Sequence, residues 1–186
     1  FGILSLNPPR IWRETHNYHH AHTAQLGGSH IGSYAMLTPR MYLALSPFQR
    51  WLYRAARHPL NIASALLTVF ALGMCLRPFV RAPRKHWQGL ASLLLVGALA
   101  AAALGLGRAD VFLFGWVVPV AVATASGAYL VYDQHTYPGV KVARRETWTF
   151  RGAALDSSSY MQMGPAMRWL AATIGVHHGH HLNAAI

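Results

Sequence analysis

The chain has 186 residues, enough for one domain, of which 53% are hydrophobic and only 11% are charged. This charged fraction is about half that of a soluble domain, so the composition favours an integral membrane protein. The net charge of +11 does not indicate nucleic-acid binding, because the basic residues lie beside apolar segments, as the positive-inside bias places them.

Residues 1–10 are apolar and end in Pro8 and Pro9, a pair that typically stops a preceding helix. They could be the tail of a span whose beginning is missing. The chain starts without a methionine, and we interpret it as a fragment of a longer protein. Residues 11–23 (IWRETHNYHHAHT) predict a helix that carries an HxxHH motif formed by His16, His19 and His20.

A glycine-rich loop follows, and residues 40–58 then mix arginine with aromatic residues, which is typical of an amphipathic segment at a membrane interface. Three apolar runs come next, at residues 60–76, 88–107 and 111–132. The first is just long enough to span a bilayer. The other two, at about 20 residues each, have the usual length of a transmembrane helix.

The tail repeats the histidine pattern. Residues 166–175 predict a short helix that leads into His177, His180 and His181, a second HxxHH. If the two motifs share a site, an even number of crossings separates them. We therefore expect residues 60–76 to be re-entrant or interfacial and residues 88–107 and 111–132 to be transmembrane. Basic residues in 77–86 and 144–151 mark the cytoplasmic side, which both motifs then face.

The histidines predict a metal site. Positions i, i+3 and i+4 share one face of a helix, so we expect each trio to converge on one point. Six imidazoles exceed the needs of one tetrahedral zinc, which implies two metals. With a single cysteine, Cys75, and five acidic residues, an iron–sulfur cluster and a carboxylate-bridged di-iron bundle are both disfavoured. Iron is the preferred metal, ahead of copper. His135, which follows the last span, joins the predicted ligands: His16, His19, His20, His135, His177, His180 and His181.

Several neighbouring residues allow two interpretations. Asp156 and Glu146 either accept hydrogen bonds from ligand imidazoles or are solvated charges. Trp148 and Trp169 either line an acyl channel or belong to an interfacial aromatic belt, and the belt is the preferred interpretation. His22 and His178 lie off the predicted shared faces and are expected to support the ligands or to lie at the surface.

Four strings carry a family resemblance: WRETHNYHHAHT, DQH, AALDSSSY and RWLAATIGVHHGHHLN. Together they resemble the membrane fatty-acid desaturase family, most of all its bacterial acyl-lipid omega-6 (delta-12) branch, over nearly the whole chain. The resemblance implies a di-iron enzyme that uses dioxygen and two electrons from ferredoxin or cytochrome b5 to place a cis double bond in a fatty-acyl chain.

The resemblance also assigns roles to residues. It makes His16, His19 and His20 the second histidine box of the family, His177, His180 and His181 the third, and His135 an additional ligand. The family's first box, HxxxH or HxxxxH, is expected upstream of Phe1, so the fragment as given is expected to be inactive. No catalytic residue is expected beyond the metal ligands.

The sequence thus predicts a single all-α membrane domain over residues 1–186, with a cytoplasmic histidine-rich di-iron cap, in the bacterial inner membrane. The expected activity is oxygen-dependent desaturation, with a membrane lipid or other acyl substrate and an electron-donor protein as partners. A fatty-acyl hydroxylase is the first alternative, because oxygen rebound after hydrogen abstraction gives an alcohol. A non-catalytic membrane metal-binding or transport protein is the second. Transport is disfavoured because the spans at 88–107 and 111–132 carry no ionisable residue.

Overall fold

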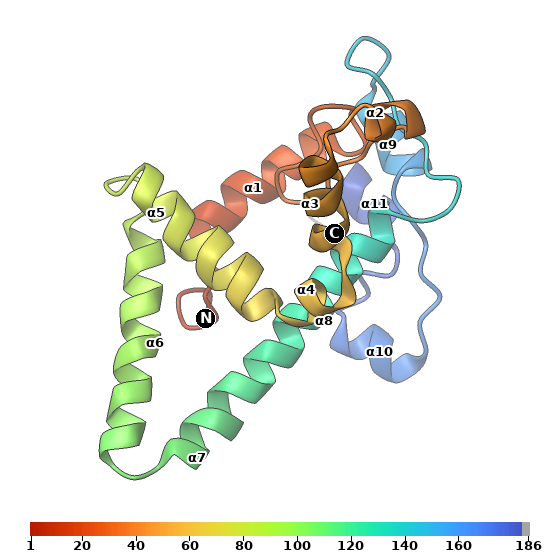
Figure 1. The fold of residues 1–186 in the computed structure, drawn as a ribbon. Coiled ribbons are helices and arrows are strands. Elements are labelled where there is room, and N and C mark those ends of the chain that lie inside the picture. Colours follow the sequence, from red (N-terminus) through yellow and green to blue (C-terminus); the bar gives the residue numbers. More distant parts are fainter. Residues whose placement is uncertain (184–186) are drawn as a thin grey trace. The chain divides into compact units, whose positions relative to one another are not determined.

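The computed structural model describes residues 1–183, and within them the regular structure is helical, with two isolated β-bridges and no strand (Figure 1). The all-α prediction is therefore confirmed for this part of the chain. The elements are α1 (Pro9–His22), α2 (Pro39–Leu43), α3 (Pro47–Arg57), α4 (Pro59–Ala63), η1 (Leu66–Leu76), α5 (Arg77–Arg81), α6 (Trp87–Gly105), α7 (Ala109–Phe112), η2 (Leu113–Val117), α8 (Val118–His135), α9 (Phe150–Asp156), α10 (Pro165–Leu170) and α11 (His177–Leu182).

The chain forms two compact units. The first contains Phe1–Glu14 and Ala55–Tyr129, and the second contains Thr15–Arg54 and Leu130–Ile186. Helices α1, α3 and α8 each have residues in both units. The expectation of a single membrane domain stays a prediction.

The N-terminal residues do not form the end of a helix. Residues 2–6 make turns, closed by a hydrogen bond of 2.8 Å from Asn7 N to Gly2 O. Pro9 is the first residue of α1, where a proline costs no hydrogen bond because the first turn of a helix leaves its N–H groups unpaired. The interpretation of Pro8 and Pro9 as a helix stop is therefore wrong, because Pro9 starts the helix that follows.

Two helices have the length and composition of membrane spans. They are α6 and the continuous helix Ala109–His135, which joins α7, η2 and α8, and the most apolar window of each has a mean hydropathy of 1.8. Only 11% and 6% of their most apolar windows are buried inside the protein. An apolar helix that leaves most of its side chains uncovered by protein suits a lipid environment better than a soluble core. The predicted spans 88–107 and 111–132 coincide with these helices to within a few residues.

Two segments of π-helix come directly before a proline-containing turn. The segment η1 precedes α5, whose second residue is Pro78, and η2 precedes α8, whose second residue is Pro119. Proline lacks an N–H and its ring clashes with the carbonyl group four residues earlier, and a wider π turn relieves that clash. The predicted run 60–76 is divided into α4 and η1, with Ser64 as the C-cap of α4, and its re-entrant or interfacial placement stays a prediction.

Close packing joins η1 and α6 in the first unit. Gly89 on α6 lies so near Cys75 that a Cβ at position 89 would overlap the carbonyl oxygen of Cys75. The buried Cys75 in turn donates its thiol hydrogen to Leu6 O at 3.3 Å. These contacts give the first unit its small core, which contains Leu6, Leu66 and Cys75.

One predicted segment is divided into two helices, and one predicted helix is shorter than expected. The interfacial segment 40–58 is divided into α2 and α3, because Pro47 begins a new helix. The helix predicted at 166–175 ends at Leu170, since Ala172 and Thr173 adopt positive φ angles of 47° and 62° that do not continue a right-handed helix. The second histidine motif therefore lies on a separate helix, α11.

Candidate metal centre

The seven predicted ligands all belong to the second unit and come from three helices, α1, α8 and α11. The structure brings their ring nitrogens together in two sets, within each of which the nitrogens lie within 4.8 Å of one another. The four-histidine group consists of His19, His135, His177 and His181, and the three-histidine group consists of His16, His20 and His180.

Each HxxHH motif is divided between the two groups. The pair at i and i+4 enters one group, and the histidine at i+3 enters the other. Around a helix, i+4 is displaced from i by about 40° in one direction and i+3 by about 60° in the other, so the two side chains point toward different centres. The expectation that each trio converges on one point is therefore wrong. Helix α1 gives its pair to the three-histidine group, whereas α11 gives its pair to the four-histidine group.

The three-histidine group is a nearly equilateral triangle of Nε2 atoms. The Nε2 atom of His16 lies 3.2 Å from that of His180 and 3.1 Å from that of His20, and the last side, from His20 to His180, is 3.1 Å. Adjacent ligand nitrogens on a metal with bonds of about 2.1 Å lie roughly 3.0 Å apart at octahedral angles and about 3.4 Å apart at tetrahedral angles. The three nitrogens are therefore spaced as one face of a metal's coordination shell.

The four-histidine group is more deeply buried and has the same spacing. The Nε2 atom of His135 lies 3.0 Å from that of His19 and 2.9 Å from that of His177, and the Nε2 atoms of His177 and His181 are 3.1 Å apart. All four side chains are buried, and His181 is only 1% exposed. Four imidazoles packed in this way, with their Nε2 atoms facing one another, form a donor set for a transition metal.

Hydrogen bonds fix the tautomer of two of these ligands. The Nδ1 atom of His135 lies 3.0 Å from Ser157 O, and a carbonyl oxygen only accepts, so Nδ1 carries the proton. The hydroxyl of Thr23 donates to His19 O at 2.7 Å and has only one hydrogen, so it accepts from His181 Nδ1 at 3.4 Å. In both rings Nε2 is left with its lone pair directed at the other nitrogens, as a metal ligand requires.

The electrostatic environment also favours neutral imidazole. Burial, together with repulsion from neighbouring histidines, lowers the pKa of His19 and of His177 to about 2. The same causes lower the pKa of His20 to about 4 and also lower the pKa values of His16 and His181. These rings are therefore uncharged at neutral pH, and a metal would not have to displace protons from them.

The groups that orient the ligands are not the ones considered from the sequence. The carboxylate of Asp156 pairs with Lys141 at 3.1 Å and is about half exposed, and Glu146 is exposed. Both agree with the interpretation as solvated charges. The orienting acceptors are the hydroxyl of Thr23 and the backbone carbonyl of Ser157. Thr23 has a sequence signal, since it follows His19 by one helical turn, but a backbone carbonyl has none.

The remaining aromatic and histidine candidates lie outside both groups. Trp148 donates its indole N–H to Thr23 O at 2.8 Å, which fixes the C-terminal end of α1, and Trp169 is 81% exposed. His22 donates from Nδ1 to Tyr18 O at 2.9 Å and stacks on the Tyr18 ring at 3.9 Å. His178 is half-buried and belongs to neither group.

The end of α8 is tied to the segment that leads into α11. Gln134, only 1% exposed, donates from Nε2 to Ile174 O at 2.9 Å, and its backbone carbonyl accepts from Ser159 N at 3.0 Å. These two bonds hold Gln134, the neighbour of His135, against Ser159 and Ile174, which lie in the segment between α9 and α11. The DQH string therefore combines a ligand candidate with the residue that positions it.

Comparison with known proteins adds a family. The family model described as "Fatty acid desaturase" matches residues 1–186. The chain is also similar to a "Fatty acid desaturase" of Bacillus subtilis (strain 168), with 28% identity over 194 residues, covering 100% of this chain and 53% of the relative. The chain thus spans about half the length of this curated relative.

Proposed function

This chain belongs to the fatty acid desaturase family, and from that premise we propose that it is the histidine-ligated metal-binding part of an oxygen-dependent fatty-acyl desaturase. The observation that carries the proposal is that two imidazole groups form and that both HxxHH motifs contribute histidines to each of them. The family implies an oxidoreductase, and the two groups supply ligands for two redox metals. The product is a cis double bond in a lipid acyl chain.

The residues fit two iron ions. The donor set consists of imidazole nitrogens, which suit iron, and it contains no thiolate or carboxylate among the described residues. His19, His135, His177 and His181 would hold one ion, and His16, His20 and His180 would hold the other. Bound iron would supply the redox chemistry with which dioxygen attacks an unactivated C–H bond.

The protein's own contribution is to orient these ligands and keep water away from them. Thr23 and the Ser157 carbonyl hold the protons of His181 and His135 on Nδ1, so that Nε2 stays available at each. Burial keeps the rings neutral and lowers the local dielectric, which strengthens interactions with a bound cation. No other side chain is assigned a catalytic role.

The two apolar helices support a location in the membrane. We propose the bacterial inner membrane, with the histidines facing the cytoplasm, because the basic residues beside the spans favour that side. Electrons would come from ferredoxin or cytochrome b5, and the substrate would be a membrane lipid or another acyl carrier.

The test is the fatty-acid composition of a host that lacks polyunsaturated lipids and expresses the full-length protein. His178→Ala is a matched control for His180→Ala, because it removes a neighbouring histidine of α11 that belongs to neither group. We expect a new double bond, detected by gas chromatography and mass spectrometry, in the wild type and in H178A but not in H180A. A hydroxylated chain would favour the hydroxylase instead. Unchanged lipids together with iron-free purified protein would contradict the proposal.

A further inference from the structure

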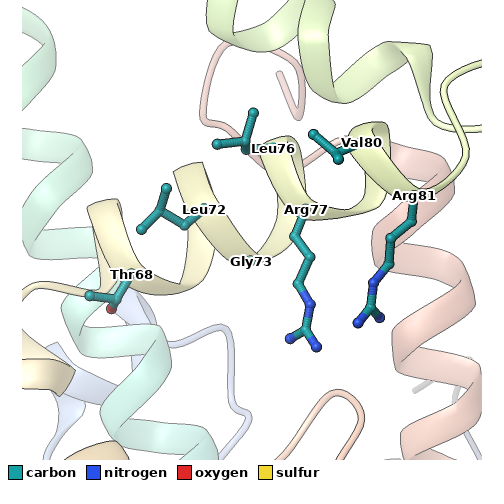
Figure 2. A pocket seen from close by; sticks show the side chains of 7 residues that line it. All are labelled: Thr68, Leu72, Gly73, Leu76, Arg77, Val80 and Arg81. Atoms are coloured by element: carbon teal, nitrogen blue, oxygen red, sulfur yellow. The ribbon is translucent and has the colours of Figure 1, made fainter.

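An open groove runs along η1 and α5 in the first unit, with a volume of about 460 Å³. The lining side chains form two columns along the helical segment, and in Figure 2 Leu76 and Val80 extend from one side of it whereas Arg77 and Arg81 extend from the other. One column is apolar and the other becomes cationic toward α5. The lining residues are Thr68, Leu72, Gly73, Leu76, Arg77, Val80 and Arg81.

The apolar column is uncovered. Leu72, Leu76 and Val80 follow one another at intervals of four residues, and their exposed fractions are 53%, 41% and 67%. Such a row of exposed aliphatic side chains is unfavourable in water and matches the side of an acyl chain.

The cationic column has no counter-charge in its own unit. Arg77 and Arg81 are exposed and lie one turn apart, and Figure 2 shows both extended in the same direction. Two like charges at this spacing repel each other. No ion pair joins either guanidinium to a carboxylate among residues 1–183.

The acidic residues of the first unit are already paired with other basic residues. The first unit contains two carboxylates, Glu14 and Asp110. Glu14 pairs with Lys85 at 3.0 Å and with Arg10 at 3.3 Å, and Asp110 pairs with Arg108 at 3.1 Å. The charge of Arg77 and Arg81 is therefore not balanced by a carboxylate of the first unit, and an anionic ligand would complement it.

We propose that the groove binds one anionic phospholipid, with its phosphate between Arg77 and Arg81 and an acyl chain along Leu72, Leu76 and Val80. Guanidinium groups suit phosphate because several N–H donors face its oxygens at once. A free phosphate would leave the apolar column uncovered, and a zwitterionic lipid would bring its own cation beside the phosphate, so that its headgroup offers the two arginines no net negative charge. The site goes beyond the proposed desaturation, because none of its residues belongs to either histidine group.

The test is lipid binding to the full-length protein in detergent, measured by native mass spectrometry. The probes are phosphatidylglycerol, phosphatidylcholine with the same acyl chains, and inorganic phosphate. We expect one phosphatidylglycerol per chain, bound at least tenfold more tightly than phosphatidylcholine. Equal affinities for the two lipids would overturn the proposal. Phosphate binding as tight as that of phosphatidylglycerol would show a phosphate site rather than a lipid site.

Variants assign the binding to the groove. Each cation near a membrane surface contributes about 1 kcal/mol to the binding of anionic lipid, so R77Q/R81Q is expected to weaken phosphatidylglycerol binding about 30-fold. The control R144Q/R145Q removes the same charge from an exposed pair outside the groove and should retain the affinity. Equal losses in both variants would show non-specific attraction and overturn the proposal.

Two further variants guard against misfolding. R77K/R81K keeps both charges and is expected to bind within a few-fold of the wild type. V80Q leaves both arginines in place and is expected to weaken binding of phosphatidylglycerol by removing an apolar contact. Unchanged binding by V80Q would contradict the acyl-chain part of the site. None of these readouts depends on desaturation, so failure here and failure of the proposed activity are distinguishable.

Discussion

Replacing Thr23 by valine tests how the four-histidine group is oriented. The substitution keeps the shape of the side chain and removes the hydroxyl that accepts from His181 Nδ1 at 3.4 Å and donates to His19 O at 2.7 Å. A buried N–H that loses its acceptor costs about 1–3 kcal/mol. The ring of His181 can avoid this cost by moving its proton to Nε2, which is the atom that faces the other ligands.

We therefore expect T23V to bind metal about 10- to 100-fold more weakly at the four-histidine group, the range for loss of a hydrogen bond to a ligand histidine. The three-histidine group should keep its affinity, because Thr23 is hydrogen-bonded to none of its members. Competition between the purified full-length protein and a chelator, monitored anaerobically with Fe²⁺, measures both affinities. The expected curve has one weakened phase and one unchanged phase.

The control is Thr147→Val, which removes an exposed hydroxyl that donates to Arg144 O at 3.3 Å and bonds to no other of residues 1–183. Thr23→Ser should restore most of the affinity, since it returns the hydroxyl. The reasoning would be refuted if T23V bound both metals like the wild type, or if both phases weakened equally.

Three further predictions follow from the same contacts. Gly89→Ala is expected to lower the midpoint of thermal unfolding by several degrees, because the new Cβ overlaps Cys75 O. The control Gly97→Ala places its Cβ in open space and should leave the midpoint unchanged. Equal midpoints for the two variants would refute the close packing. The metal-free protein should lose stability as the pH falls below about 6.5, because His19 and His177 have folded-state pKa values of about 2 while the unfolded chain takes up protons near 6.5. Denaturant unfolding measured from pH 7.5 to 5 should therefore show a free energy of unfolding that rises with pH and levels off above 7. A flat profile would contradict burial of neutral imidazole. Gln134→Leu should weaken metal binding by freeing the His135 end of α8 from Ile174 O, and an affinity equal to that of the wild type would exclude this positioning role.

The histidines themselves could be selected from the sequence, but their division could not be. The HxxHH spacing identified the helices and the side chains, because three imidazoles within five residues are unusual on a soluble surface. The rule that residues i, i+3 and i+4 share one face of a helix does not separate the side chains at i+3 and i+4, although these are about 100° apart around the helix axis. Only the positions of α1 and α11 relative to each other within the second unit show that His19 joins His177 and His181.

The hydrogen-bonding partners of the ligands show a similar limit. Charged residues were the natural candidates from sequence, yet Asp156 pairs with Lys141 and the orienting acceptors are Thr23 and a backbone carbonyl. Any residue can contribute a carbonyl, so composition gives no signal for Ser157. Pro9 illustrates the same point for the fold, since a proline is compatible with the end of one helix and with the start of the next.

Two metals held by the two imidazole groups are the basis of the proposed function. The most direct test is the iron content of the anaerobically purified full-length protein, measured by mass spectrometry of the metal for the wild type, His16→Ala and His19→Ala. We predict two iron ions per chain in the wild type and about one in each variant, with H16A losing the ion of the three-histidine group and H19A losing the other. A wild-type content of one ion or none, in protein that is folded, would contradict the two-metal centre.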